Sequence, residues 1–326
     1  MNIRLTAGHN ECFYCGLTFG PNELTREHVF PKWLQRRFTL WDQSLTLLND
    51  TLIQYRNLVV PACHLCNTVV LSKLEGDVAS SLPGGAEKIR ALGHDRVFAW
   101  ISKIFFGILY AEALLPSDRS NLGQGPILPD GALTDFEHMH FLMQSAHGRY
   151  EFHGVEVAYH TSILVFDVQE FDNEMFNFMY HDDVSLGCIA IRIGKIGIIY
   201  VADGGAQERI AQEVLPKLFA HQLHPLQFEE MTALTFARAR GFNRNPLHIL
   251  VKGGSDQSTR MIFQPPLAGL SNRPVFDEFD RTVFAQLLSQ FTGIPLEIIS
   301  PANGQVMTWI GDYGEPRFID ARVHHP

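Results

Sequence analysis

The spacing of apolar and polar positions divides the chain into helical and extended stretches. From Glu87 to Leu115, apolar residues recur every three or four positions, the period of a helix that buries one face. Residues 150–168 alternate and then become continuously apolar, and residues 187–202 hold two β-branched runs on either side of Gly194-Lys195, which predicts a hairpin. These patterns together predict an α+β fold with a mainly antiparallel sheet.

The same periods place the remaining elements and a domain boundary. Helices are expected over residues 68–80, 133–145, 206–222, 226–240 and 276–291, and short strands over 248–251, 261–263 and 296–299. Between residues 80 and 87, the sequence Ser-Ser-Leu-Pro-Gly-Gly interrupts any helix. We therefore expect a small domain over 1–82 and a larger α+β domain over 86–326, whose role (regulatory, sensing, substrate-selecting or oligomerising) no motif assigns.

Composition and charge narrow the class of protein. The 326 residues are 46% apolar and 19% charged, which excludes a disordered chain, a collagen-like array and a coiled coil. Lys and Arg total 26 against 35 Asp and Glu, so the net charge of −9 disfavours nucleic-acid binding over the whole surface. Residues 1–76 carry 7 basic and 6 acidic side chains, so the acidity lies outside the first domain.

The location of the protein follows from its apolar stretches. The first ten residues lack the apolar run of an export signal. Residues 98–115 are the most apolar stretch, but Lys103 and Glu112 lie within it, which is typical of a buried amphipathic helix rather than a membrane span. We expect a cytoplasmic protein without a membrane partner, and the sequence leaves a homo-oligomer open.

Four of the five cysteines form two Cys-x-x-Cys pairs, Cys12 with Cys15 and Cys63 with Cys66, with 47 residues between the pairs. Each pair can wrap one edge of a Zn²⁺ ion, so a structural zinc is predicted. A thioredoxin-like redox pair is the alternative, and it leaves the second pair unexplained. The fifth cysteine, Cys188, lies in an apolar strand pattern and is interpreted as a small buried residue.

The residues between and within the cysteine pairs form a further pattern. Glu27-His28-Val29-Phe30-Pro31 is followed by Asn57-Leu58-Val59 and, at the second pair, by Cys66-Asn67. In this order they resemble the HNH endonuclease family, the ββα-metal nucleases, in its four-cysteine zinc subtype. The resemblance covers about residues 10–76, under a quarter of the chain. It implies an N-terminal ββα-metal domain that hydrolyses phosphodiester bonds in nucleic acid, first of all DNA, and it suggests bacterial phage defence or DNA processing.

Hydrolysis of a phosphodiester requires an activated water and neutralised charge on the phosphoryl group, and His28 is suited to be the general base. The resemblance assigns Glu27 and Asn67 as ligands of a catalytic Mg²⁺ or Mn²⁺, ions that prefer such oxygen donors. It also assigns Asn57 to orienting the His28 loop. The alternatives are a helix N-cap for Asn67 and an ordinary turn residue for Asn57. Strand alternation sends Glu27 and His28 to opposite faces unless the strand is twisted or bulged.

A third ligand of the catalytic metal is expected in the helix after Asn67, and the sequence does not identify it. Leu71 cannot ligate a metal, and Glu75 lies about 12 Å from Asn67 along an ideal helix. His64, between the second pair of cysteines, is expected to face solvent.

Basic residues follow Pro31, which suits the first position of a helix. Lys32, Arg36 and Arg37 could grip phosphates, or they could form a solvated basic face. Trp33 could wedge against a base, or it could belong to a small core.

The competing class is a non-catalytic zinc-knuckle adaptor or nucleic-acid-binding module, in which Glu27 and His28 are surface residues. The discriminating observation is whether His28 and Asn67 converge on one point.

Overall fold

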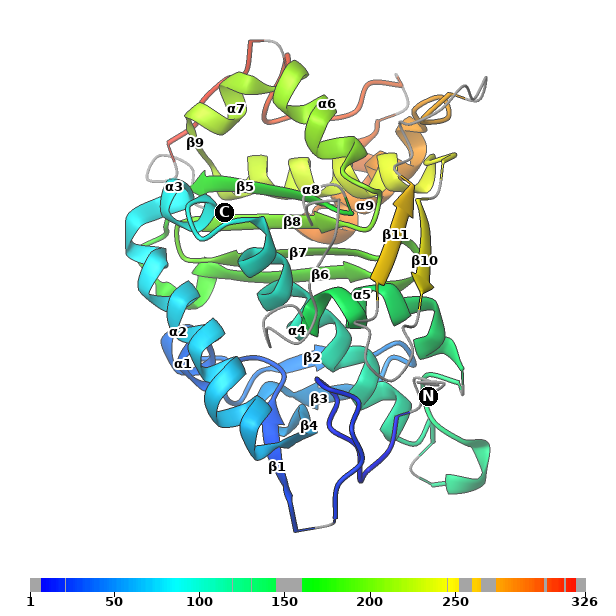
Figure 1. Cartoon of the computed structure of the whole chain (residues 1–326). Helices are drawn as coiled ribbons and strands as arrows, with labels where there is room; N and C mark the ends of the chain where they lie inside the picture. Colours follow the sequence, from blue (N-terminus) through cyan, green and yellow to red (C-terminus); the bar gives the residue numbers. More distant parts are fainter. Residues whose placement is uncertain are drawn as a thin grey trace. The chain divides into compact units, whose positions relative to one another are not determined.

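A computed structural model describes the chain over residues 7–20, 22–118, 120–129, 131–144, 160–244, 246–251, 260–264, 274–301, 304–313 and 315–320. The chain forms two compact units (Figure 1). Unit 1 comprises residues 1–81, 92–153 and 250–260, and unit 2 comprises residues 82–91, 154–249 and 261–326. The chain first leaves unit 1 within the interval where the sequence predicts a boundary, and it returns to unit 1 at residue 92.

Unit 1 is built on two paired strands followed by a helix. Its elements up to residue 81 are β1 (Leu24–His28), α1 (Lys32–Arg37), β2 (Ser44–Thr46), β3 (Leu52–Gln54), β4 (Val59–Cys63), a π-helical turn (Cys66–Leu71) and α2 (Ser72–Ser81). β1 pairs antiparallel with β4, so that Leu24 is opposite Cys63 and His28 is opposite Val59. β2 and β3 form a second antiparallel pair. The expected helix over 68–80 is therefore a π-helical turn that continues into α2.

The core of unit 1 contains the helix α4 (His94–Leu114), which contacts α2, β4 and α5 (Glu137–Met143). The sequence predicts one helix from Glu87, but Gly93 adopts a φ of +88° and separates α4 from α3 (Gly85–Arg90), which belongs to unit 2. Among the helices that the structure describes, α4 alone is long and apolar enough to cross a membrane. Most of it is buried inside the protein, as the sequence predicts for a core helix.

Unit 2 contains a five-stranded sheet in the order β6-β7-β8-β5-β9. The strands are β5 (Ser162–Val168), β6 (Phe178–Asp183), β7 (Cys188–Ile193), β8 (Ile196–Val201) and β9 (Gln222–Leu223). All neighbours in this sheet are antiparallel except β9, which runs parallel to β5. The α+β class and the hairpin around Gly194 are thus confirmed. Residues 150–159 of the expected strand lie outside the described residues.

A proline or a capping side chain starts most of the helices of unit 2. They are α3, α6 (Ala206–Val214), α7 (Pro216–Ala220), α8 (Pro225–Arg240), α9 (Arg281–Thr292) and α10 (Leu296–Ile299). The expected helix over 206–222 is divided at Pro216, because proline cannot donate the hydrogen bond that would continue α6. The strand expected over 296–299 is wrong, since Pro295 caps the short helix α10 there.

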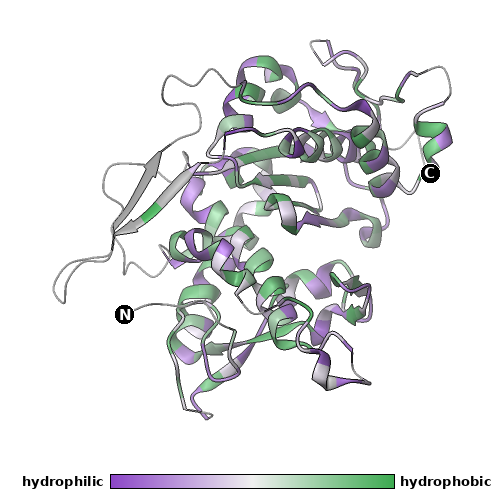
Figure 2. Ribbon diagram, turned by 90° about the vertical axis from the view of Figure 1, so that its right-hand side faces the viewer, coloured by the Kyte–Doolittle hydropathy of each residue, from purple (hydrophilic) through white to green (hydrophobic). Residues whose placement is uncertain are grey.

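The remaining predictions agree in kind with the structure. A separate two-stranded sheet pairs β10 (Leu247–Val251) with β11 (Arg260–Gln264). Cys188 is fully buried in β7. All residues of β7 and β8 are buried, which accounts for their apolar sequences, interrupted in β7 by the buried Arg192. Figure 2 shows that most helices carry both apolar and polar residues, as amphipathic helices do.

Candidate metal centre and adjacent cleft

The four cysteines of the two pairs form one buried cluster. The Sγ atoms of Cys12, Cys15, Cys63 and Cys66 all lie within 4.8 Å of one another. Gly16 makes the first turn possible with a φ of +66°, and its N–H donates to the carbonyl oxygen of Cys12 over 2.8 Å. In the second turn, the N–H of Cys66 lies 3.5 Å from Sγ of Cys63.

The cluster fits the requirements of a structural zinc site. Tetrahedral zinc with four Zn–S bonds places its sulfur atoms about 3.8 Å apart, and thiolates are the ligands that zinc selects. Hydrogen bonds with Cys12 and Cys66 lower the pKa of the Cys15 thiol, and hydrogen bonds with Cys12 and Cys15 raise the pKa of the Cys66 thiol, so Cys15 is the first of these thiols to become a thiolate. A zinc site needs all four sulfurs to converge, whereas a redox pair needs only two.

Buried polar contacts fix the first cysteine turn within unit 1. The Tyr14 hydroxyl donates to the carbonyl oxygen of Met143 over 2.7 Å, and the N–H of Phe13 donates to Pro61 over 2.9 Å. Nε2 of His140 lies 3.0 Å from the carbonyl oxygen of Phe13. Burial lowers the pKa of His140 to about 4, so this histidine is neutral near pH 7.

A cleft of about 410 Å³ opens in unit 1, lined by β1, the start of α1 and the π-helical turn with α2. Its lining includes Glu27, His28, Lys32, Asn67 and Glu75. The structure therefore brings His28 and Asn67 to one site. Asn67 directly follows Cys66 of the four-cysteine cluster, so the cluster determines where the turn that carries Asn67 begins.

His28 is the last residue of β1 and is half-buried in the cleft. Its Nδ1 atom is buried and has no hydrogen-bond partner among the described residues. Its ring lies 6.1 Å from the ring of Trp41. Burial and, after it, the charge of Lys32 lower the pKa of His28. A neutral imidazole, the form that can accept a proton, is thereby favoured at pH 7.

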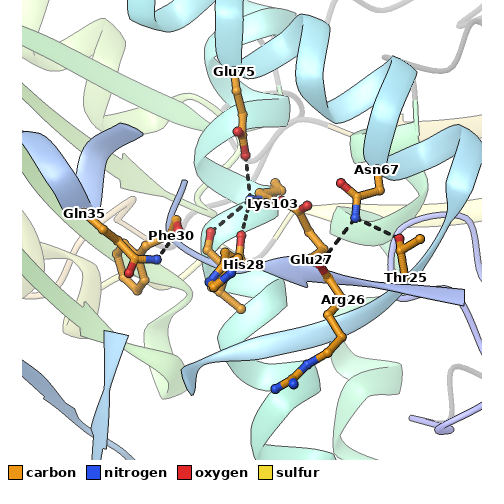
Figure 3. A network of polar contacts seen from close by, with 10 residues as sticks. Thr25, Arg26, Glu27, His28, Phe30, Gln35, Asn67, Glu75 and Lys103 are labelled. Carbon is orange, nitrogen blue, oxygen red and sulfur yellow. Dashed lines mark hydrogen bonds and ion pairs between the residues drawn. The ribbon is translucent and has the colours of Figure 1, made fainter. Parts of the chain in front are cut away.

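Glu27 is held by a buried lysine from α4. Oε1 of Glu27 lies 2.7 Å from Nζ of Lys103, whose side chain has no exposed surface. The same Nζ atom contacts three more oxygens (Figure 3), namely Oε1 of Glu75 at 2.8 Å and the carbonyl oxygens of His28 and Val29 at 2.7 and 3.1 Å. Burial by itself would lower the pKa of Lys103, but the two carboxylates outweigh it and raise the pKa. Lys103 is therefore an ammonium ion.

Glu75 lines the cleft, although the sequence places it too far from Asn67 to identify it as a ligand, and Lys103, which the sequence did not identify, contacts Glu75 and Glu27. A π-helical turn is wider than an α-helical one, so the residues after Leu71 are rotated away from their ideal-helix positions and Glu75 reaches the cleft. Burial raises the pKa of Glu75, and Lys103 opposes that rise. The signal in the sequence for Lys103 was a charged residue within the apolar stretch 98–115, since such a residue needs a partner when it is buried.

Asn67 joins the π-helical turn to β1. Its Nδ2 atom donates to Oγ1 of Thr25 over 2.8 Å and to the carbonyl oxygen of Arg26 over 3.4 Å. The N-cap position of the turn is Leu65, so Asn67, which lies inside the turn, is not its N-cap. In Figure 3 the amide oxygen of Asn67 lies on the side of Glu27.

Asn57 is not part of the cleft. It is exposed at the end of a 3₁₀ turn (Tyr55–Asn57), and its Nδ2 donates to Oε1 of Gln54 over 3.3 Å. The main chain of the next residue makes the link to the His28 segment, because the N–H of Val29 donates to the carbonyl oxygen of Leu58 over 3.1 Å.

The basic residues of α1 lie at different distances from the cleft. Lys32 is exposed and lines it, and Trp33 is half-buried in its wall. Arg36 and Arg37 are exposed in the last turn of α1 and do not line the cleft. His64 is exposed, as the sequence predicts.

The oxygen donors of the cleft suit a hard divalent cation, with one restriction. The carboxylates of Glu27 and Glu75 and the amide oxygen of Asn67 are ligands of the kind that Mg²⁺ and Mn²⁺ prefer. One oxygen of each carboxylate already contacts Lys103. A divalent cation would therefore use the second oxygen of each carboxylate.

Comparison of the chain with protein-family models, with curated proteins and with solved structures finds no match.

Proposed function

We propose that the protein is a metal-dependent endonuclease of the HNH type, which hydrolyses phosphodiester bonds in nucleic acid, first of all DNA. The observation that carries the proposal is that Glu27, His28 and Asn67 line one cleft in the unit that holds the four-cysteine cluster. Two antiparallel strands followed by a helix support them, which is the arrangement that the sequence resemblance implies.

In this proposal His28 is the general base. Nδ1 is enclosed by protein, so Nε2 is the nitrogen that a water in the cleft would meet. The water oxygen forms a bond to phosphorus while its proton passes to Nε2 of His28. The P–O3′ bond breaks, and O3′ keeps the electron pair and takes a proton from solvent. The products are a 5′-phosphate and a 3′-hydroxyl, as the resemblance implies.

The other cleft residues have separate roles. Glu27 and Asn67, with Glu75 as the nearest further carboxylate, would hold a divalent cation, which neutralises charge on the phosphoryl group and the leaving oxygen. Lys32 is exposed beside His28 and would contact a phosphate of the substrate. Arg36 and Arg37, further along α1, would contact the nucleic-acid backbone outside the cleft.

One observation favours a second candidate, a non-catalytic zinc module that binds nucleic acid or a protein partner. The ion pairs of Lys103 with Glu27 and Glu75 are what a purely structural buried network would contain. Under this reading, the cleft binds no divalent cation and His28 performs no chemistry.

Cleavage assays on the full chain separate the two candidates. The purified protein is incubated with plasmid, linear duplex, single-stranded DNA and RNA, each with Mg²⁺, Mn²⁺ or EDTA. We expect cleavage with a divalent cation and none with EDTA. His28→Ala should lower the rate by about 10²- to 10⁴-fold, the usual scale for a lost general base.

The matched control is His64→Ala, which removes an exposed histidine of the same unit. Both variants should retain the parent's zinc content, and His64→Ala should cleave at the parent's rate. If His28→Ala keeps its zinc and fold and cleaves as fast as the parent on every substrate, His28 is not the base. If the parent cleaves none of the substrates, the module without catalysis is favoured.

A further inference from the structure

The ammonium group of Lys103 occupies a position that is built like a cation site (Figure 3). Four oxygens lie within 3.1 Å of its Nζ atom, two from carboxylates and two from main-chain carbonyls. An ammonium has three N–H donors, so at least one donor is shared between two acceptors. Carboxylate and carbonyl oxygens are also the usual ligands of hard divalent cations.

The place of the ammonium is fixed by the packing of α4. The Lys103 side chain is fully buried, and its helix lies close to the end of β1. At Gly107, one turn further along α4, a Cβ atom would lie only 3.1 Å from Cγ1 of Val29. The residue Val29 also supplies one of the carbonyl oxygens on Lys103. α4 therefore holds Nζ against the carboxylates of Glu27 and Glu75 through close contacts on two successive turns.

We propose that Lys103 is a positioning residue that sets the cation affinity of the cleft. Its ammonium holds one oxygen of Glu27 and one of Glu75, so that the second oxygens remain for a divalent cation. It also limits the formal charge of the three side chains to −1. A divalent cation consequently binds beside a fixed positive charge and binds weakly. This inference rests on the proposed function for what the bound cation does. Binding of Mn²⁺ to the cleft can be measured without cleavage of nucleic acid.

A series of variants changes the formal charge of the cluster in steps. The parent has −1, from two carboxylates and one ammonium. Lys103→Met has −2, Glu75→Gln has 0, and the double variant Lys103→Met with Glu75→Gln returns to −1. Methionine is unbranched and fills the space of the lysine stem, and glutamine keeps the shape of the glutamate.

The experiment measures Mn²⁺ binding to the full, zinc-loaded chain by electron paramagnetic resonance of free Mn²⁺. Lys103→Met should bind Mn²⁺ at least about tenfold more tightly than the parent, because a buried positive charge near the site is lost. Glu75→Gln should bind it at least about threefold more weakly. The double variant should lie within about threefold of the parent, as its charge is the same.

The matched control is Lys73→Met, which removes an exposed lysine of α2 that does not line the cleft. Solvent screens that charge, so Mn²⁺ affinity should change by less than about threefold. Zinc content is measured for every variant, and the sulfur cluster should retain zinc because Mn²⁺ prefers oxygen ligands.

Two results would overturn the inference. One is a Lys103→Met protein that keeps its zinc and fold but binds Mn²⁺ no more tightly than the parent. The other, decisive even where Lys103→Met does not fold, is a folded Glu75→Gln protein with the parent's Mn²⁺ affinity. If the parent cleaves no nucleic acid but the Mn²⁺ affinities of the variants follow their formal charges, the proposed function is refuted and the role of Lys103 is retained.

Discussion

Nζ of Lys103 lies 2.7 Å from Oε1 of Glu27, and both side chains are buried. The lysine comes from the core helix α4 and the glutamate from β1, so this ion pair joins an element outside the cysteine-bearing segment to the centre of the cleft. Glu27 is therefore part of a network whose charges are already partly balanced. Any role of Glu27 toward a substrate or a metal depends on the lysine beside it.

The stability of unit 1 should depend on this network. Lys103→Met leaves the carboxylates of Glu27 and Glu75 buried without their counter-ion, and breaking a buried pair in this way costs about 3–5 kcal/mol. Adding Glu75→Gln removes one of those charges and should recover part of the loss. Chemical denaturation of the parent and both variants measures the free energy of unfolding. A Lys103→Met protein as stable as the parent would show that the pair contributes nothing.

Zinc should be a structural component of unit 1. We expect about one zinc per purified chain, and Cys63→Ala should lose it and destabilise unit 1, because a zinc site that loses a thiolate loses folding free energy. The control is Cys188→Ala, which removes the buried cysteine of unit 2 and should leave the zinc content unchanged. Metal analysis and thermal unfolding check both variants. A folded, metal-free parent protein would contradict this prediction.

The acidic limb of the pH–rate profile should report His28 if it is the base. Burial and Lys32 lower the pKa of His28 below its usual value of 6.5, so the neutral imidazole persists at pH values somewhat below 6.5. The value of kcat/KM should therefore begin to fall only below pH 6.5. Lys32→Gln removes one cause of the lowering and should shift the limb upward. Cleavage rates between pH 5 and 8 measure both profiles. An unshifted limb in Lys32→Gln would mean that another group titrates.

Acid should destabilise unit 1 through His140. Burial lowers its folded-state pKa from 6.5 to about 4, so its contribution to stability is complete above pH 6.5 and is lost as the pH falls toward 4. The loss at pH 4 is on the order of 3 kcal/mol. In His140→Gln this part of the pH dependence should disappear. Zinc thiolates also take up protons in acid, but they do so in both proteins, so the difference between the two denaturation series isolates His140.

In unit 2, Gly197 of β8 allows α8 to approach the sheet. A Cβ atom at Gly197 would lie 2.4 Å from the ring of Phe228, which is fully buried. Gly197→Ala should therefore destabilise unit 2 by about 1–3 kcal/mol through overpacking. The control is Gly76→Ala in α2, where no atom lies within 4 Å of the added methyl group and alanine favours the helix. A neutral Gly197→Ala would mean that the ring moves aside at no cost.

Several features of this protein follow from local sequence alone. The Cys-x-x-Cys spacing defines two turns that each can offer two thiolates to a metal, because the geometry of such a turn depends only on adjacent residues. The Gly194-Lys195 hairpin and the apolar helix around Lys103 follow in the same way from the period of their side chains. Local residues also explain two incorrect predictions. Gly93 divides one predicted helix, and Pro295 starts a helix where a strand was expected.

Only the tertiary structure decided what surrounds Glu27 and His28. Lys103 reaches Glu27 because α4 packs in the core of unit 1, and Glu75 reaches the same ammonium because a π-helical turn alters the register of the segment that leads into α2. Sequence spacing carries no information about such a contact, since it depends on how distant segments pack and on which buried charges must be balanced. The sequence by itself determined the two cysteine turns and the candidate base, and packing determined the charge of the cleft in which that base lies.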